Sequence, residues 1–302
     1  MTHSNPYMEG RGSLIALGYF DGVHRGHQAV LQRAVQKSGV DGCTPMALTF
    51  DMSLMRPGSK APGDIMTGRQ RYSEMARLGI PQTVAMDFRN VAGLSGEEFV
   101  RDILVGSYRA CGVCCGGDFR FGTGRSCGID ELEELCKRYG LTLDVVAPVL
   151  HDGLPISSTR IRGALEQGDM EAVNGMLGRS YSQRLVVYRD RQLATRLGFP
   201  TINQRFPGQL ACPRFGVYHT RIQIDSTWYD AVSNIGRRPT VEGGDVHTVL
   251  ESHILDFTGN LYRRKIEVRF LSFLRDEQRF DSLDELKTAV LQDIRSVRKR
   301  MD

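Results

Sequence analysis

The chain has 302 residues, of which 41% are hydrophobic and 25% are charged, a balance typical of soluble globular proteins with room for two domains. No run of apolar residues approaches the roughly 20 that a bilayer-spanning helix needs, and residues 1–11 lack the apolar core of a secretory signal. The net charge of +4 is dispersed except at 184–196 and 295–300, which we interpret as solvated faces. We therefore expect a cytoplasmic protein with no membrane or nucleic-acid partner.

Seven cysteines are an odd number, and a reducing compartment would keep all of them as thiols without disulfides. Cys111, Cys114 and Cys115 superficially resemble a metal knuckle, but no second pair follows at a suitable spacing. Because the segment also has the pattern of a buried strand, we interpret these cysteines as small hydrophobic residues.

The first half of the chain alternates short apolar runs with helical patterns. This alternation predicts an α/β fold with a doubly wound, Rossmann-like parallel sheet, in which ligands bind beyond the carboxyl ends of the strands. The predicted strands are 14–17, 46–50, 83–86, 110–115 and 141–146, and the predicted helices are 27–36, 69–78, 96–105 and 129–139.

The pattern changes in the second half. Two helices are predicted at 157–167 and 170–177, after which β-type runs dominate until Ser282 begins a last helix. We expect a C-terminal antiparallel β-barrel with a terminal helix, and a domain boundary near Gly178 that gives domains 1–178 and 179–302. The β-type runs are 185–188, 217–224, 228–232, 249–255 and 266–273.

The strongest local signal is Gly18-Tyr-Phe-Asp-Gly-Val-His-Arg-Gly-His27, at the junction of the first strand and the first helix. A helix N-terminus presents free N–H groups and a positive dipole end to a phosphate, and the glycines let the backbone approach a ligand closely. His24 and His27 are three residues apart and can both point at one phosphate group. Helix capping or packing is the alternative explanation of the histidine pair.

A second signal is Ile156-Ser-Ser-Thr-Arg-Ile-Arg162, at the start of a later helix. Ser157 or Ser158 is a natural N-cap, and capping alone would account for it. The functional interpretation adds the guanidinium of Arg162, one turn into the helix, as a second contact for the same phosphates.

These two motifs in this order resemble those of the adenylyltransferase superfamily. Together with Gly117-Asp-Phe-Arg-Phe-Gly122, they resemble specifically the bacterial bifunctional riboflavin kinase/FAD synthetase, and the similarity runs from about Leu14 to Arg300. The resemblance implies that His24, His27 and Arg162 hold the phosphates of ATP. It implies further nucleotide contacts at Gly18, Phe20, Asp21, Gly22, Gly26, Asp118, Phe119, Ser157, Ser158 and Thr159.

The implied reaction is a direct displacement in which the phosphate of FMN attacks the α-phosphorus of ATP, and FAD and pyrophosphate are formed. Positioning and charge neutralisation would supply the catalysis, with Mg²⁺ bridging phosphate oxygens. The sequence departs from the family pattern at Asp51-Met-Ser-Leu-Met55, where Pro-His-Pro is usual, and at Tyr19, where Asn is more common.

The C-terminal half carries Leu197-Gly-Phe-Pro-Thr-Ile-Asn203, which by itself indicates a turn beside a strand. In the functional interpretation, the Thr201 hydroxyl and the Asn203 carbonyl are hard oxygen ligands for Mg²⁺. Asn234-Ile-Gly-Arg-Arg-Pro-Thr240 and Leu250-Glu-Ser-His-Ile-Leu-Asp-Phe257 resemble the riboflavin kinase half of the same family.

That resemblance implies that Glu251 is the base that deprotonates a ribityl hydroxyl of riboflavin, which attacks the γ-phosphate of a second ATP. It also implies that Arg275 lies on the flavin side of the site. His253 is interpreted as a residue that packs or makes a hydrogen bond to the backbone.

The kinase half also departs from its family. Residues 184–196 hold four arginines and no glycine where the family has a glycine-rich phosphate loop, and Asn260-Leu-Tyr-Arg263 replaces Asp-Leu-Tyr-Gly. Two alternatives to a two-activity enzyme therefore remain. One is an FMN adenylyltransferase whose degenerate kinase domain binds flavin or serves as a scaffold, and the other is a flavin-sensing or nucleic-acid-binding protein. The sequence indicates no oligomeric state.

Overall fold

The computed structural model describes residues 12–51, 63–189, 198–239 and 246–300. They form two compact units. The first comprises Thr67–Ser157 and the described part of Met1–Ala61, and the second comprises the described parts of Pro62–Met66 and Ser158–Asp302. The two helices that follow residue 157 therefore make most of their contacts with the second unit and belong to it. The division of function at residue 178 stays a prediction.

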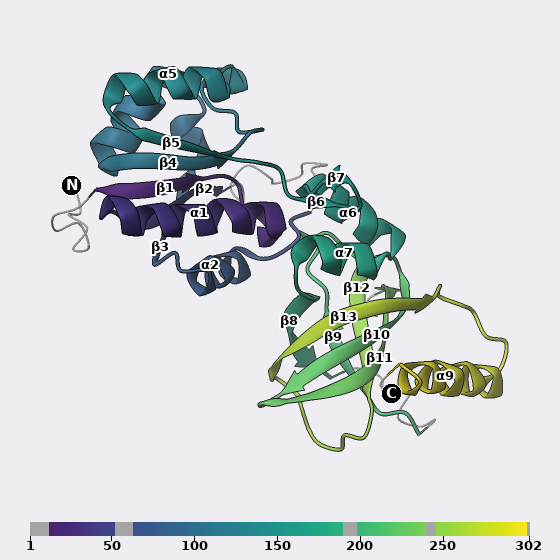
Figure 1. Ribbon diagram of the computed structural model, residues 1–302. Coiled ribbons are helices and arrows are strands. Elements are labelled where there is room, and N and C mark those ends of the chain that lie inside the picture. The colour runs from purple at the N-terminus through teal and green to yellow at the C-terminus, as the bar shows by residue number, and fades with distance from the viewer. Residues whose placement is uncertain (1–11, 52–62, 190–197, 240–245, 301–302) are drawn as a thin grey trace. The chain divides into compact units, whose positions relative to one another are not determined.

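The first unit is built on a parallel five-stranded sheet with the order β3-β2-β1-β4-β5 (Figure 1). This arrangement confirms the predicted doubly wound α/β fold. Since all five strands are parallel, their carboxyl ends share one edge of the sheet. The strands are β1 (Ser13–Leu17), β2 (Thr44–Asp51), β3 (Gln82–Asp87), β4 (Ala110–Gly116) and β5 (Thr142–Val146).

Helices cover both faces of this sheet. Figure 1 shows α1 (Arg25–Asp41) and α2 (Gly68–Arg77) on one face and α5 (Ile129–Tyr139) on the other. The side chains of β1 are fully buried between these layers, which explains its uninterrupted apolar sequence. The shorter elements are η1 (Asp21–Val23), α3 (Phe88–Val91), α4 (Gly96–Glu98), η3 (Phe99–Ser107), η4 (Thr123–Arg125), β6 (Leu150–His151) and β7 (Leu154–Pro155).

The helix predicted at 96–105 is divided into α4 and η3, and η3 is wound as a π-helix. The Tyr108 amide donates to the Ile103 carbonyl, five residues earlier, at 3.2 Å. Phe99 and Leu104 still face the core, so the apolar pattern located the buried side of the segment correctly. The pattern did not distinguish a π-helix from an α-helix.

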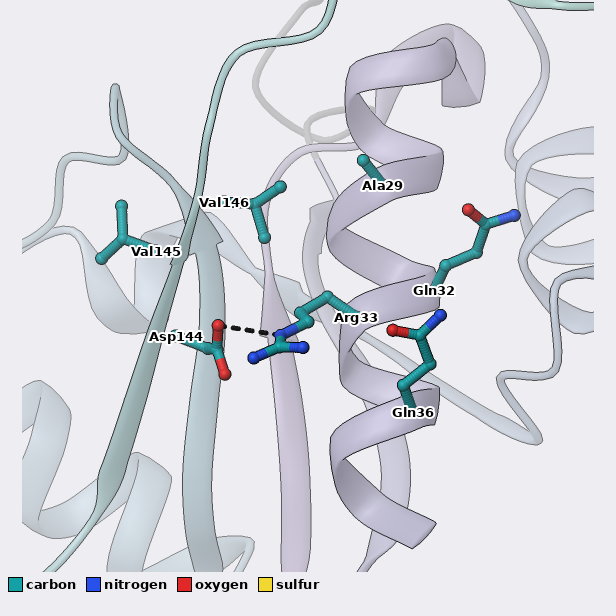
Figure 2. A pocket seen from close by; sticks show the side chains of 7 residues that line it. All are labelled: Ala29, Gln32, Arg33, Gln36, Asp144, Val145 and Val146. Carbon is teal, nitrogen blue, oxygen red and sulfur yellow. Dashed lines mark hydrogen bonds and ion pairs between the residues drawn. The ribbon is translucent and has the colours of Figure 1, made fainter. Parts of the chain in front are cut away.

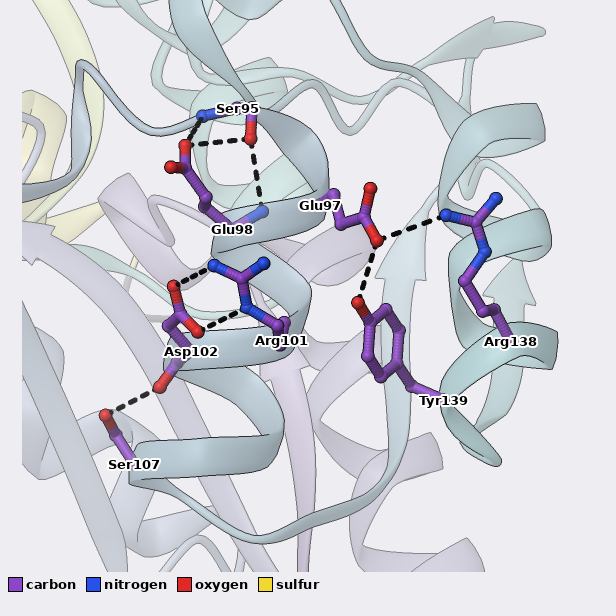
Figure 3. A network of polar contacts seen from close by, with 8 residues as sticks. All are labelled: Ser95, Glu97, Glu98, Arg101, Asp102, Ser107, Arg138 and Tyr139. Carbon is purple, nitrogen blue, oxygen red and sulfur yellow. Dashed lines mark hydrogen bonds and ion pairs between the residues drawn. The ribbon is translucent and has the colours of Figure 1, made fainter.

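Polar contacts join the start of this segment to α5 (Figure 3). Ser95 caps α4, because its hydroxyl accepts from the Glu98 amide at 3.2 Å and its own amide donates to the Glu98 carboxylate at 2.8 Å. The Glu97 carboxylate accepts from Arg138 at 3.2 Å and from the Tyr139 hydroxyl at 2.9 Å, and both donors belong to α5. The network is exposed, so it orients the two helices rather than adding much stability.

Two of the seven cysteines are joined, so the expectation of seven thiols is wrong. A disulfide links Cys43, just before β2, to Cys111 in β4, and their Cα atoms are 7.0 Å apart. The sheet order places β2 and β4 on opposite sides of β1, which brings together residues 68 positions apart in the sequence. Cys114 and Cys115 are buried in β4, and burial raises the pKa of each thiol to about 12.

The disulfide predicts a specific alkylation pattern. Protein purified without reductant and then denatured should carry five alkylated cysteines by mass spectrometry, and seven after reduction. Reduction, or the change Cys43→Ser, should destabilise the first unit by about 2–4 kcal/mol, since a 68-residue loop is no longer closed in the unfolded chain. Cys212→Ser, in the second unit, is the control and should leave the melting temperature nearly unchanged. Seven alkylated cysteines before reduction would contradict the bond.

The second unit is a closed antiparallel barrel with the strand order β10-β11-β12-β9-β8-β13, as predicted. Its interior holds aromatic side chains, with the rings of Tyr218 and Phe270 meeting edge to face at 5.3 Å between centroids. The strands are β8 (Tyr181–Tyr188), β9 (Thr201–Arg205), β10 (Gly216–Ile224), β11 (Thr227–Pro239), β12 (Val246–Ile254) and β13 (Lys265–Arg275), and the helices of this unit are α6 (Ser158–Gln167), α7 (Met170–Leu177) and α9 (Leu283–Arg298).

The terminal helix α9 packs on the outside of the barrel. It begins at Ser282, as predicted, whose hydroxyl accepts from the Glu285 amide at 3.2 Å. Near its other end, Val297 is fully buried against Val217 and Val232 of the barrel wall. Val217 of β10 and Val232 of β11, which point outward from the barrel, are therefore covered by this helix.

Candidate active sites

The first candidate site lies at the carboxyl edge of the parallel sheet. The loop that follows β1 contains the sequence Gly18–His27, and the loop that follows the neighbouring strand β4 contains Asp118 and Phe119. Because β1 and β4 pair in parallel, both loops leave the sheet at the same edge. The sheet therefore brings together two of the motifs that the sequence singled out.

The turn between β1 and α1 has an unusual backbone. Phe20 and Val23 have φ values of 56° and 40°, in the left-handed region that side chains with a Cβ rarely adopt. Gly22, between them, has a φ of 79°, which only glycine adopts without strain. Phe20, Asp21 and Val23 are also buried, so the strained residues are held by their surroundings. Such strain concentrates at binding and catalytic sites.

His24 and His27 are brought together at the start of α1. Their rings stack with centroids 3.6 Å apart and planes 17° from parallel, and the Phe20 ring meets His27 edge to face at 5.4 Å. His24 is the N-cap of α1, and its Nδ1 accepts from the His27 amide at 3.3 Å. A ring that accepts at Nδ1 carries its proton on Nε2 when neutral, which makes Nε2 the donor. Capping and phosphate binding are thus compatible roles for His24.

Gly26 makes room for this stacked pair. A Cβ at residue 26 would lie 3.2 Å from two atoms of the His24 ring. It would also lie 3.9 Å from the carbonyl oxygen of Ile156, the residue that opens the second motif. The first unit therefore places Ile156, and with it the adjoining Ser157, beside the His24–His27 pair.

His27 is held in its neutral form. Burial lowers the pKa of His27 well below its usual value, and the nearby charges of His24 and Arg71 lower it further. Its Nδ1 is enclosed and has no hydrogen-bond partner among the described residues. A neutral imidazole with one enclosed nitrogen can hold a phosphate oxygen by a directed hydrogen bond through the other.

The remaining residues of the second motif belong to the second unit. Ser158, Thr159 and Arg162 all lie in the first turns of α6, and the Arg162 Nε donates to the Gly63 carbonyl at 2.9 Å. Their convergence with His24 and His27 on one triphosphate stays a prediction.

The first unit positions the other predicted contacts as follows. Asp118 is exposed, and Phe119 is half-buried and stacks on Phe121 with ring centroids 5.8 Å apart. An exposed carboxylate next to an aromatic face suits a nucleotide or a flavin ring. Gly18 donates its amide to the Leu48 carbonyl at 3.3 Å, which anchors the start of the turn to β2.

The second candidate site is a row of polar residues across three strands of the barrel. Asn203 of β9, Glu251 of β12 and Asn234 of β11 are direct partners in the strand register. Thr201, two residues before Asn203 on the same face, donates its hydroxyl to Glu251 Oε1 at 2.8 Å. The structure therefore brings together the predicted base and both predicted Mg²⁺ ligands. Strand β9, which the sequence indicated only as a turn beside a strand, carries two of them.

The comparisons with known proteins match a family model to each half of the chain. The FAD synthetase family model matches residues 7–160, and the riboflavin kinase family model matches residues 177–301. The bifunctional riboflavin kinase/FMN adenylyltransferase of Pseudomonas fluorescens is 37% identical over 96% of this chain and 93% of its own length. The protein of the same name from Escherichia coli K12 is 33% identical over 93% of this chain and 90% of its own length. The chain belongs to the bifunctional riboflavin kinase/FMN adenylyltransferase family.

A solved structure has the same fold throughout. A protein from Streptococcus pneumoniae, titled a macrolide-efflux protein, aligns with a TM-score of 0.86 at 26% identity and covers 98% of this chain and 95% of its own. Among the residues that our structure describes, no helix is both long and apolar enough to traverse a membrane.

Three further residues lie at the second candidate site without having been predicted there. Arg238 of β11 forms an ion pair with Glu251 Oε2, and Asn234 donates to Glu277 at 3.3 Å. Glu277 also covers Gly236, where a Cβ would clash with its carboxylate. Asn234 and Arg238 were visible in the family motif 234–240, but only the strand register shows that they face Glu251.

Arg275, the predicted flavin residue, has a structural partner. Its Nε and Nη2 donate to the two carboxylate oxygens of Asp293 on α9, at 3.0 and 2.8 Å. This bidentate pair is largely buried and attaches the terminal helix to β13. A flavin contact by Arg275 stays a prediction. His253, predicted to pack or to bond to the backbone, makes a hydrogen bond through Nδ1 with the Pro200 carbonyl at 2.9 Å.

The departures from the family pattern lie partly outside the described residues. This holds for 52–55 in the first unit and for 190–196 of the arginine-rich stretch. Of that stretch, Arg184 is exposed on β8, and the Arg189 guanidinium lies 5.1 Å from the centroid of the Tyr262 ring. Arg189 therefore stacks on one residue of the second departing segment, 260–263.

A hollow of about 340 Å³ lies between α1 and the end of β5 (Figure 2). An ion pair between Arg33 and Asp144, 2.9 Å apart, lies beside it, and Val145 forms part of its wall. None of the predicted phosphate contacts lines this hollow. It is therefore not part of the phosphate site.

Proposed function

We propose that this chain makes FAD from riboflavin in two ATP-dependent steps. The barrel unit transfers the γ-phosphoryl group of ATP to riboflavin, giving FMN and ADP. The first unit, together with the motif at 158–162, transfers AMP from a second ATP to FMN, giving FAD and pyrophosphate. The observation that supports this most directly is the stacked His24–His27 pair at a helix N-terminus, with Ile156 of the second motif beside it.

In the adenylyl transfer, the protein acts by positioning and by charge. The FMN phosphate oxygen attacks the α-phosphorus of ATP, and the bond to pyrophosphate breaks, so that no covalent enzyme intermediate is needed. We propose that His24 Nε2 and His27 donate to phosphate oxygens, and that Arg162 neutralises charge that develops at the α-phosphate. The amides at the start of α1 add the positive end of its dipole.

In the phosphorylation, Glu251 is the proposed general base. It is paired with Arg238 and accepts a hydrogen bond from Thr201, which fixes the direction of one carboxylate oxygen. It takes the proton of the ribityl hydroxyl as that oxygen attacks the γ-phosphorus and ADP leaves.

Mg²⁺ fits the residues of the barrel site. The Asn203 side chain is 7% exposed, and its Oδ1 has no hydrogen-bond partner among the described residues. A buried amide oxygen without a partner is costly unless a cation or a donor satisfies it, and Mg²⁺ prefers oxygen ligands. Bound with ATP, Mg²⁺ would neutralise charge on the transferring phosphate. We propose that Thr201 and Asn203 hold it there.

The proposed partners are small molecules: ATP, riboflavin, FMN and FAD. Neither a nucleic acid nor a membrane takes part in the proposed reactions, and we place them in the cytoplasm because ATP is the donor in both.

Incubation of the full chain with ATP, Mg²⁺ and riboflavin, followed by chromatography of the flavins, tests this proposal. We expect FMN to appear first and FAD to follow. FAD formed only when FMN is supplied would support the alternative of a degenerate kinase domain. Absence of both products would contradict the enzyme assignment.

A further inference from the structure

Arg71 is a buried cation of the first unit that neither proposed reaction uses. It is the fourth residue of α2, and it is only 7% exposed to solvent. Its Nε has no hydrogen-bond partner among the described residues. Burial of a guanidinium with an unused donor opposes folding. The position of Arg71 therefore indicates a role other than stabilising the fold.

Arg71 is bound to the turn between β1 and α1. Its Nη1 donates to the Tyr19 carbonyl at 2.9 Å, and its guanidinium carbon lies 4.9 Å from the centroid of the Tyr19 ring. Thr49, buried in β2, donates its hydroxyl to the same carbonyl at 2.9 Å. Two elements that are distant in the sequence therefore fix a single peptide group.

That peptide group begins the strained part of the turn. The next residue, Phe20, has a φ of 56°, and Val23 has a φ of 40°. Residues other than glycine keep such a conformation only where the surrounding structure enforces it. The Phe20 ring in turn contacts the His27 ring edge to face. A chain of contacts thus runs from Arg71 through Tyr19 and Phe20 to His27.

We propose that Arg71 is a positioning residue of the adenylyl-transfer site, an inference that rests on the function proposed for this unit. By holding the Tyr19 carbonyl, Arg71 keeps Phe20 in its left-handed conformation and its ring against His27. His27 is then presented to the phosphates of ATP in one orientation. Arg71 itself contacts no reacting atom.

The charge of Arg71 adds a second, measurable effect on His27. Burial lowers the pKa of His27 most, followed by the charge of His24 and then that of Arg71. His24 lies at the start of α1 and Arg71 lies in α2. The buried acid Asp21 lies in η1, between β1 and α1. Removal of the Arg71 charge raises the pKa of His27, so that His27 becomes protonated at a higher pH. A lysine at residue 71 keeps the charge and avoids this change.

Four variants test the proposal: Arg71→Met, Arg71→Lys, Thr49→Val and, as the control, Arg77→Met. Arg77 lies on the same helix but is exposed and paired with Glu74 at 3.1 Å. The measurements are kcat and KM for ATP in FAD synthesis across acidic and neutral pH, the riboflavin kinase rate of the same protein, and the melting temperature. The kinase rate reports whether a loss is confined to the first unit.

Arg71→Met should lower kcat/KM for FAD synthesis on the order of 100-fold and move the acidic limb of its pH profile to higher pH. Arg71→Lys and Thr49→Val should each lower kcat/KM about tenfold. The acidic limb should not move, because both variants keep a positive charge at residue 71. Arg77→Met should match the wild type, and no variant should change the kinase rate. A purely structural role predicts lower melting temperatures without a shift of the acidic limb.

Full activity in Arg71→Met would overturn the proposal. If that variant does not fold, wild-type activity in both Arg71→Lys and Thr49→Val would overturn it equally. Wild-type protein that forms no FAD from FMN would refute the function proposed for this unit, whereas variants as active as an FAD-forming wild type would refute only the role of Arg71.

Discussion

Replacement of His27 by alanine is expected to lower FAD formation from FMN by about 100- to 1,000-fold while riboflavin phosphorylation continues. The stacked pair loses one of its two imidazoles, and the Phe20 ring loses the partner that it contacts. With neither donor nor packing at this position, the phosphates of ATP are no longer held in line with the FMN phosphate. Chromatography of flavins, with FMN or riboflavin as the starting substrate, measures the two steps separately.

The kinase rate of the same protein is the internal control for this variant. His27→Asn retains a donor and part of the side-chain volume, and it should recover some of the lost rate. Equal loss of both activities in His27→Ala would mean that the two sites do not act independently, and an unchanged rate of FAD formation would remove His27 from the phosphate site.

Glu251→Gln is expected to lower riboflavin phosphorylation by about 100- to 10,000-fold and to leave FAD formation from FMN unchanged. Glutamine has nearly the same shape and can still accept from the Thr201 hydroxyl, but it cannot take a proton. It also leaves Arg238 without its carboxylate partner. The test is the initial rate of FMN formation from riboflavin and ATP.

Glu267→Gln is the matched control for Glu251→Gln. Both glutamates lie on barrel strands, both are mostly buried, and Glu267 is paired with Arg269 at 3.0 Å as Glu251 is paired with Arg238. A general cost of losing a buried carboxylate would appear in both variants, whereas loss of a catalytic base appears in one. An undiminished phosphorylation rate in Glu251→Gln would refute its role as the base.

The order and type of most elements follow from local sequence patterns. The apolar runs 14–17 and 46–50 became β1 and β2 because a strand buried on both faces needs an uninterrupted apolar stretch. The histidine motif was located correctly at the β1–α1 junction because glycines and a following helical pattern are local features. Likewise, Thr201 and Asn203 were indicated as Mg²⁺ ligands by their side-chain oxygens, whereas the role of Glu251 came from the family resemblance.

Which distant residues share a site depends instead on the tertiary fold. Arg71 and Thr49 meet the same carbonyl although 52 and 30 residues separate them from Tyr19, and no periodicity in the sequence relates such positions. The disulfide between Cys43 and Cys111 and the pairing of Arg238 with Glu251 arise in the same way, from the order of strands in a sheet and the register between them. Local pattern reflects the conformation of neighbouring residues, whereas strand order and register follow from burying the whole chain at once.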